Sequence, residues 1–133
     1  MKRRDTGIQL PSVSDELSQR EQAAAAQAQR LAAQTSLAQA LASVDSPEQM
    51  TAFLTDLCTP AELEALGDRW SVVPLLADGV SYRQVHEQTG VSVTTVGRVA
   101  RCLEHGTGGY RDVLARTREE ALGHSRGAQP AHG

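Results

Sequence analysis

Four polar residues in the second half of the chain have the types and spacing needed to contact a nucleic acid. Thr94, Thr95, Arg98 and Arg101 lie within residues 80–103, VSYRQVHEQTGVSVTTVGRVARCL. On a helix, these side chains lie on the face opposite the apolar positions. Short hydroxyls near a helix N-terminus, followed by arginines one and two turns later, suit base edges and phosphates in a major groove. We therefore expect this segment to bind double-stranded DNA.

Two short helices joined at a glycine must position these side chains. In the first helix, Val85 packs with Tyr82 and Thr89 at helical spacing, and Gly90 can take the left-handed conformation that ends a helix. Ser92 can cap the second helix. The apolar residues of the second helix form one inward face: Val93, Val96, Ala100 and Leu103. This arrangement predicts a helix-turn-helix.

Two residues of the motif need an explanation. His86 stands four residues before Gly90, where the two helices cross closely and a small residue is favoured. We expect its ring to tilt outward, and a pH-sensing role is the alternative. Gly97, inside the second helix, costs about 1 kcal/mol relative to alanine. Either DNA approaches the backbone at Gly97, or the glycine is simply tolerated at an exposed position.

Charge is unevenly distributed along the chain. The formal net charge of −3 argues against a generally basic, nucleic-acid-binding surface. Residues 45–78, however, carry seven acidic residues and one arginine, a net −6, whereas residues 81–118 carry six arginines and three acidic residues, a net +3. The basic part coincides with the predicted motif, so DNA binding through a local patch is expected to weaken steeply with salt.

Length and composition favour one dimeric domain. The chain has 133 residues, of which 3% are aromatic, with Trp70 as the single tryptophan. A monomer of this composition has little bulky material for a core, and dimerisation buries more surface. No apolar run reaches the roughly 18–20 residues of a membrane span, and the start MKRRDTGIQLPS lacks the apolar stretch of a secretory signal. We expect a cytoplasmic protein without membrane contact.

The sequence offers no arrangement for catalysis or metal binding. Cys58 and Cys102 form no CxxC pair and have no histidine at metal-ligand spacing, so we expect buried free thiols and no metal. Glu62 and Glu64 are explained by helix capping and by the helix dipole, and no serine, cysteine and histidine set suggests a nucleophile. The chain is therefore not expected to be an enzyme.

About six helices and no strands are predicted, which defines an all-α fold. Residues 14–44 should form an alanine-rich helix, whose apolar stripe, able to pack in a dimer, begins at Leu31. Residues 47–57 and 60–79 should form capped helices, with Pro74 kinking the second or weakening its last turn. The last helix should run from residue 110 to about 122.

Four segments follow from this pattern. We expect a mobile tail at residues 1–13, an alanine-rich helical extension at 14–34, the folded domain at 35–122, and a disordered tail at 123–133. The Lys2-Arg3-Arg4 cluster either touches DNA as an arm or is a solvated terminus.

Three segments, FLTDLCTPAELEALGDRW, SYRQVHEQTGVSVTTVGRVARCLEHG and GGYRDVL, resemble the Trp repressor superfamily, and more closely its YerC/YecD-like branch. The resemblance covers residues 35–118. It implies an intertwined all-helical homodimer that places two recognition helices in successive major grooves roughly 34 Å apart on a palindromic operator. Combined with the pattern of the motif, it assigns DNA contacts to eight residues: Ser81, Tyr82, Arg83, Ser92, Thr94, Thr95, Arg98 and Arg101.

In the Trp repressor, an indole-binding slot beside the motif holds the corepressor tryptophan. The positions that the resemblance assigns to this slot are Thr59, Arg69, Arg98, Val99 and Cys102. Val99 stands where the Trp repressor has glycine, and Cys102 where it has serine. A valine side chain projects into the volume that the indole needs, and overpacking costs about 1–3 kcal/mol. We therefore expect no tryptophan response and assign no cofactor, and whether another small-molecule effector binds is left open.

The sequence thus predicts a sequence-specific transcriptional regulator, a repressor by resemblance, which acts as a homodimer. The alternative is a helical dimeric protein-interaction module that binds a partner through its long N-terminal segment and keeps only a vestigial helix-turn-helix.

Overall fold

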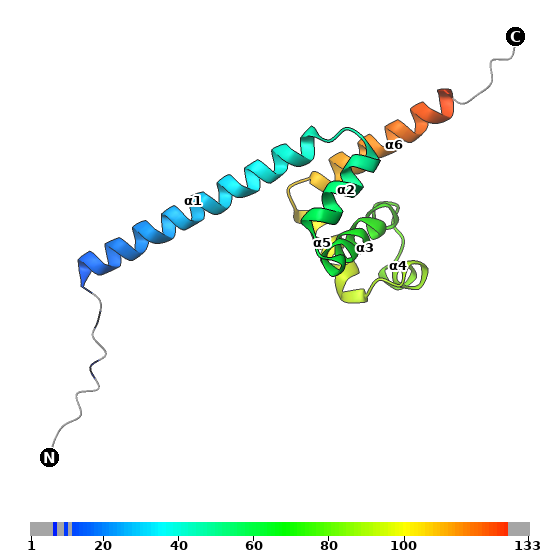
Figure 1. Cartoon of the computed structure of the whole chain (residues 1–133). Helices are drawn as coiled ribbons and strands as arrows, with labels where there is room; N and C mark the ends of the chain where they lie inside the picture. Colours follow the sequence, from blue (N-terminus) through cyan, green and yellow to red (C-terminus); the bar gives the residue numbers. More distant parts are fainter. Residues whose placement is uncertain (1–6, 8–9, 11, 128–133) are drawn as a thin grey trace, which may run out of the picture. The chain divides into compact units, whose positions relative to one another are not determined.

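The structure, a computed structural model, describes Gly7, Leu10 and residues 12–127, with side chains up to residue 123. This part of the chain contains six α-helices and no strand, which confirms the predicted all-α fold (Figure 1). The helices are α1 (Val13–Ser43), α2 (Pro47–Leu57), α3 (Pro60–Ala77), α4 (Tyr82–Thr89), α5 (Val93–His105) and α6 (Gly109–Gly127). The basic cluster at residues 2–4 and most of both predicted tails lie outside the described residues.

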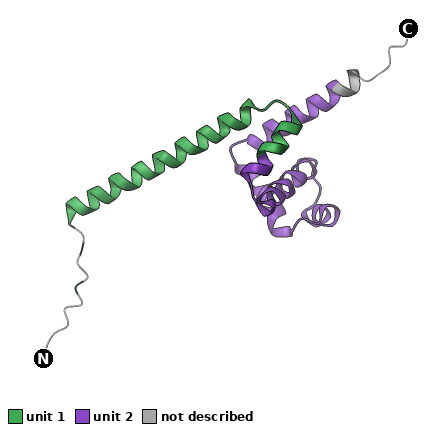
Figure 2. Ribbon diagram, in the orientation of Figure 1, with its two compact units in different colours: residues 1–53 green, residues 54–133 purple. Residues whose placement is uncertain are grey.

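The chain forms two compact units, residues 1–53 and residues 54–133, and the boundary falls inside α2 (Figure 2). The predicted helical extension at residues 14–34 is part of α1, which continues without interruption to Ser43. The separation that the sequence predicts at residue 34 therefore does not coincide with a break in a helix.

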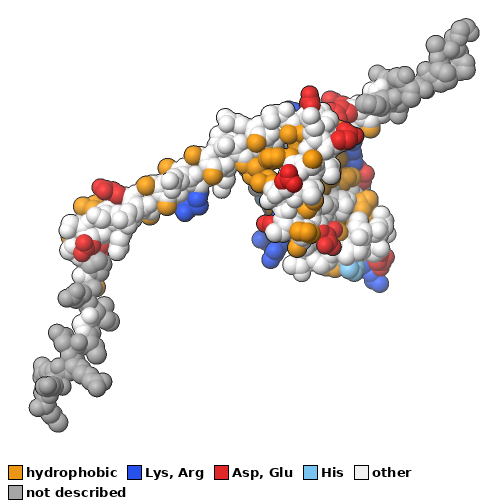
Figure 3. Space-filling model, in the orientation of Figure 1, with side chains coloured by type: hydrophobic (Ala, Val, Ile, Leu, Met, Phe, Trp, Pro, Cys, Tyr) orange, Lys and Arg blue, Asp and Glu red, His pale blue; other side chains and the backbone are white. Residues whose placement is uncertain are grey.

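In the first unit, α1 is held by local interactions. Ser12 caps it, since its hydroxyl accepts a hydrogen bond from the backbone N–H of Asp15 at 3.2 Å. None of the 31 residues of α1 is buried, and hydrophobic side chains lie on its surface (Figure 3). Alanine, the strongest helix former, is abundant in α1, so its helical state depends on propensity more than on packing.

Local capping and a glycine turn define the ends of α3. The Thr59 hydroxyl accepts from the Glu62 backbone N–H, and a Glu62 carboxylate oxygen accepts from the Thr59 backbone N–H at 2.9 Å, which completes a capping box. At the other end, Gly79 has a φ of 81°, and the Val80 N–H donates to the Leu75 carbonyl at 3.0 Å. The predicted end near Gly79 is confirmed, and α3 continues through Pro74 to Ala77.

The core of the second unit lies where α3 packs against α4, α5 and α6. Its buried members are small aliphatic residues: Val72, Val73, Val85, Val91, Val96, Val99, Leu103 and Leu114. Because α3 supplies the central surface, the two helices of the motif are fixed against a common support.

Three expectations from the sequence are wrong in detail. Val93, placed on the inward face, is 53% exposed, because it begins α5 and Val91 of the preceding turn fills the core instead. Both cysteines are free, but Cys58 is half-buried and Cys102 is exposed, so neither is a buried thiol. The last helix continues to Gly127 rather than ending near residue 122.

Candidate nucleic-acid interface

The helix-turn-helix forms as its sequence predicts. Ser81 caps α4 by accepting from the Gln84 N–H at 3.3 Å, and Gly90 ends the helix with a φ of 76°, in the left-handed region. Ser92 then caps α5 by accepting from the Thr95 N–H at 3.2 Å. Both helix starts and the turn are therefore specified by residues within the motif itself.

Helix α5 has a buried face and an exposed face with different chemistry. The buried face is apolar and carries Val96, Val99, Ala100 and Leu103. The opposite face carries Thr94, Arg98 and Arg101, which follow one another at helical spacing and are all exposed. The polar side chains expected to reach DNA are thus brought onto one open surface.

Two of the predicted contact residues are already engaged within α5. The Ser92 hydroxyl accepts from the Thr95 backbone N–H and donates to the Thr95 hydroxyl oxygen at 3.0 Å. Thr95 is half-buried. These two hydroxyls shape the helix start, whereas the Thr94 side chain, on the outer face, has no hydrogen bond to a described residue.

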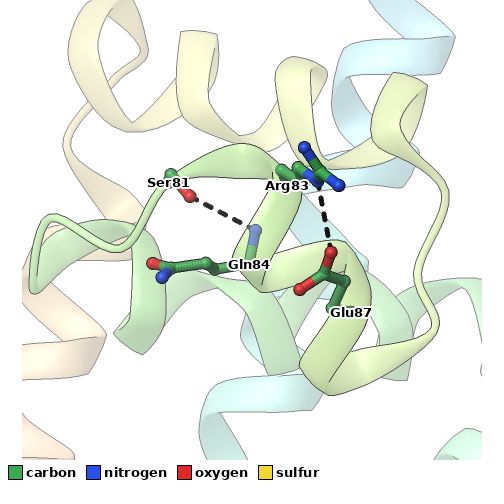
Figure 4. A network of polar contacts seen from close by, with 4 residues as sticks. All are labelled: Ser81, Arg83, Gln84 and Glu87. Atoms are coloured by element: carbon green, nitrogen blue, oxygen red, sulfur yellow. Dashed lines mark hydrogen bonds and ion pairs between the residues drawn. The ribbon is translucent and has the colours of Figure 1, made fainter.

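The arginines of the motif differ in their partners. The Arg83 guanidinium pairs with the Glu87 carboxylate at 3.2 Å on the exposed side of α4 (Figure 4), a kind of contact that contributes little to stability. Arg98 and Arg101 have no ion-pair or hydrogen-bond partner among the described residues. Their charges are therefore available to an anionic ligand without first breaking a pair.

A small hollow of about 380 Å³ lies beside this exposed face. It is lined by Tyr82 from α4 and by four residues of α5: Gly97, Arg101, Glu104 and His105. A Cβ added at Gly97 would meet no atom within 4 Å, so the fold does not itself require a glycine there.

The turn holds contacts that the sequence did not indicate. The His86 Nδ1 lies 2.6 Å from the Val91 carbonyl oxygen. The Thr89 hydroxyl donates to the Val85 carbonyl at 2.7 Å and accepts from the Val91 N–H at 3.1 Å. His86 is exposed, as expected, yet its ring is tied to the turn by a hydrogen bond. The one sequence signal for His86 was its position four residues before Gly90, where a small residue is favoured.

Two arginines of α6 join it to α5 and to α3. The Arg111 Nε donates to the Leu103 carbonyl at 3.0 Å in the last turn of α5, and Arg118 pairs with Asp78, the C-cap of α3, at 3.0 Å. The sequence showed a basic C-terminal half but not which arginines have structural partners. The basic patch expected from composition is thus divided between positioning arginines and free ones.

The residues assigned to the ligand slot are in different environments. Thr59 is engaged in the α3 capping box, and Arg69 and Arg98 are exposed. Val99 is 2% exposed and packs in the core, whereas Cys102 lines a surface hollow.

The hollow beside Cys102 is apolar and has a volume of about 590 Å³. Its walls include Trp70 and Tyr110, whose ring centroids lie 6.4 Å apart, and Val113, and its remaining lining comes from residues 106–109. Of the five slot residues, Cys102 is the one in this lining.

Among the described residues, no three histidine, cysteine or acidic side chains are grouped so that they could hold a metal ion. No helix in the same part of the chain is long and apolar enough to span a bilayer.

The fold and the exposed α5 face define an all-α helix-turn-helix protein. The family model for the Trp repressor protein matches residues 32–118, and the chain belongs to this family. The match covers α1 from residue 32 onward and continues into α6.

Individual relatives agree with this assignment. The chain is 38% identical over 72 residues to the uncharacterized protein YerC of Bacillus subtilis (strain 168), a match that covers 54% of this chain and 69% of YerC. This supports the YerC-like branch.

Two solved structures are similar as well. A TrpR-like protein from Eubacterium eligens is 34% identical, with a TM-score of 0.59 over 62% of this chain and 86% of that one. A putative Trp repressor from Staphylococcus aureus is 31% identical, with a TM-score of 0.62 over 65% of this chain and 87% of that one.

Proposed function

We propose that this protein is a sequence-specific transcriptional regulator, a repressor, that binds a palindromic DNA operator as a homodimer. In this proposal α5 enters the major groove, where Thr94 and Arg98 meet base edges or nearby phosphates and Arg101 meets a phosphate. The N-terminus of α4, with Ser81, Tyr82 and Arg83, contacts the DNA backbone. Family membership supports a DNA-binding regulator.

The observation that carries the proposal is that Arg98 and Arg101, on the exposed face of α5, have no ion-pair or hydrogen-bond partner among the described residues. The opposite face of the same helix is buried, so the helix cannot turn these side chains inward. Two such guanidinium groups, one helical turn apart, can reach adjacent phosphates or a guanine edge.

Unpartnered apolar surface supports the homodimer. Among the described residues, the fully buried core contains no side chain larger than leucine, while Trp70, Tyr110 and Val113 line an open hollow. Leu57 and Leu66 are 49% and 43% exposed. A second copy of the chain that covers these side chains would supply the burial that a single small core lacks.

The position of Val99 supports independence from tryptophan. A side chain that packs in the core at 2% exposure cannot withdraw without leaving a cavity. In this proposal, Val99 fills the volume that a glycine would leave open for an indole ring.

The test is a selection of DNA fragments bound by the purified full chain at low salt, followed by titration of the enriched sequence. We expect a palindrome bound by two chains, with an affinity that L-tryptophan does not change. Arg98→Ala and Arg101→Ala should each weaken binding by about 1–3 kcal/mol. The matched control is Arg30→Ala, an exposed arginine of α1. If no sequence is enriched, the proposal fails.

A protein-interaction module is the second candidate, and α1 is the observation that favours it. Its 31 residues include none that is buried, and Leu17 and Leu31 are 52% and 55% exposed. Such a module would keep its partner in the Arg98→Ala, Arg101→Ala double variant, whereas the regulator would lose its operator.

A further inference from the structure

His86 lies beside the turn of the motif, where its ring contacts the backbone carbonyl of Val91. The turn from Thr89 to Val91 is cross-linked on one side by the Thr89 hydroxyl, which joins the Val85 carbonyl to the Val91 N–H. The Val91 carbonyl is contacted from the other side by the His86 ring at 2.6 Å. Both polar groups of Val91, whose side chain is buried in the core, thus bond to side chains of α4.

The geometry fixes the protonation pattern of the ring. A carbonyl oxygen can only accept, so Nδ1 carries the hydrogen and donates it to Val91. The other ring nitrogen, Nε2, is then the acceptor in the neutral ring. Any form of the ring with a hydrogen on Nδ1 can make this bond. We call the hydrogen bond between His86 Nδ1 and the Val91 carbonyl the tie.

The tie acts on the angle between the two helices. Val91 is followed directly by Ser92, the N-cap of α5, so its carbonyl lies at the entry to the recognition helix. The ring of His86 belongs to the last turn of α4. A hydrogen bond between these two points limits how far α5 can rotate against α4, in addition to the limit set by packing on α3.

We propose that His86 is a positioning residue of the DNA-reading unit: its Nδ1–H holds the Val91 carbonyl and thereby the orientation of Thr94, Arg98 and Arg101. This inference rests on the proposed DNA-binding function and deepens it. Without the tie, the side chains that contact DNA are still present, but a smaller fraction of molecules holds α5 in the orientation that binds. The apparent affinity for DNA falls in proportion to that fraction.

The experiment compares three variants in the full chain. His86→Ala removes the donor, and His86→Asn keeps an N–H donor at a similar distance from the backbone. Gln88→Ala changes an exposed neighbour on α4 that has no hydrogen bond to a described residue. Thermal unfolding establishes that each variant is folded, and operator affinity is measured over a range of salt concentrations.

We expect His86→Ala to weaken operator binding by about three- to ten-fold, as for loss of one ordinary hydrogen bond. The slope of log affinity against log salt should stay that of the parent, because no phosphate contact is lost. His86→Asn should recover most of the affinity, and Gln88→Ala should match the parent. In the parent without DNA, nitrogen-15 NMR of the neutral ring should show the hydrogen on Nδ1.

Three results would overturn the assignment. A salt slope that drops by about one in His86→Ala would make His86 a direct phosphate contact. Equal affinities for His86→Ala and the parent, or for His86→Asn and His86→Ala, would remove the positioning role. A hydrogen on Nε2 alone would remove the bond itself. If the parent selects no DNA, the proposed function fails, while the NMR measurement still decides whether the tie exists.

Discussion

Helices α1 and α5 are stabilised in opposite ways. Helix α1 has 31 residues and none of them is buried, whereas α5 has 13 residues and four are buried. Both carry arginines without a partner among the described residues, namely Arg20 and Arg30 in α1 and Arg98 and Arg101 in α5.

This difference affects how well arginines on the two helices are positioned to bind a ligand. An arginine on α1 lies on a helix that is stabilised mainly by helix propensity and its N-terminal cap, because none of the α1 residues is buried. The arginines of α5 are held by packing of the opposite face against α3, by the Ser92 cap and by the turn. Preorganisation of this kind is what specific recognition requires.

The largest effect should come from placing a charge on the buried face of α5. Val96→Asp, at a fully buried position, should destabilise the fold by more than about 4 kcal/mol, because an unpaired carboxylate would be removed from water. The measurement is denaturant unfolding followed by the fluorescence of Trp70. Leu17→Asp is the matched change on α1, and we expect it to alter stability by no more than about 0.5 kcal/mol. Comparable losses from both variants would mean that α1 is packed in the assembled protein.

A smaller effect is expected at Gly97, where one substitution should change stability and DNA affinity in opposite directions. Gly97→Ala should stabilise the protein by about 1 kcal/mol, because alanine favours the helix and its Cβ would meet no atom within 4 Å. If DNA approaches the backbone at the hollow beside Gly97, the same methyl should weaken operator binding by about 1–3 kcal/mol.

Gly67→Ala provides the control for this prediction. Gly67 lies inside α3, and a Cβ there would likewise meet no atom within 4 Å. It should stabilise the protein without changing DNA affinity. Equal operator affinities for Gly97→Ala and Gly67→Ala would favour the explanation that Gly97 is merely tolerated.

The smallest effect on stability concerns the N-terminal caps of α1 and α3. Helix α1 begins with a serine cap alone, whereas α3 has a reciprocal capping box. The Thr59 backbone N–H, and to a lesser extent its hydroxyl, hold the pKa of the Glu62 carboxyl below its ordinary value by hydrogen bonding. A lowered folded-state pKa means that this stabilisation is present above the unfolded pKa and is lost as the pH falls through the folded one.

Unfolding curves across the acid range should show this contribution. Glu62→Gln should be less stable than the parent at neutral pH, and the difference should shrink as the pH falls below about 4. Curves that stay parallel down to the lowest pH would contradict a role for the ionised carboxylate in the cap.

Much of the fold could be predicted because its helix boundaries are local. Thr59 with Glu62, Gly90 and Ser92 act on backbone groups within a few residues, and these starts and stops are confirmed. The inward positions Val96, Ala100 and Leu103 followed from helical periodicity in the same way. The Trp repressor family was recognisable for this reason, since its motifs are runs of such local features.

Several of the parts that were wrong or missed depend on how the helices and the turn pack together. Val93 fits the apolar period, but whether it is covered depends on where α3 and the turn lie. The slot positions were assigned by resemblance, and their surroundings could not be read from spacing.

The sequence by itself therefore determined six helices, a helix-turn-helix and a basic outer face on α5, because hydrogen bonds and periodicity within one helix fix these features. Only the tertiary structure decided which basic residues are free. Arg111 and Arg118 are engaged with α5 and α3, whereas Arg98 and Arg101 have no partner among the described residues. A side chain's partner depends on how separate helices pack, and that information is not contained in any one segment.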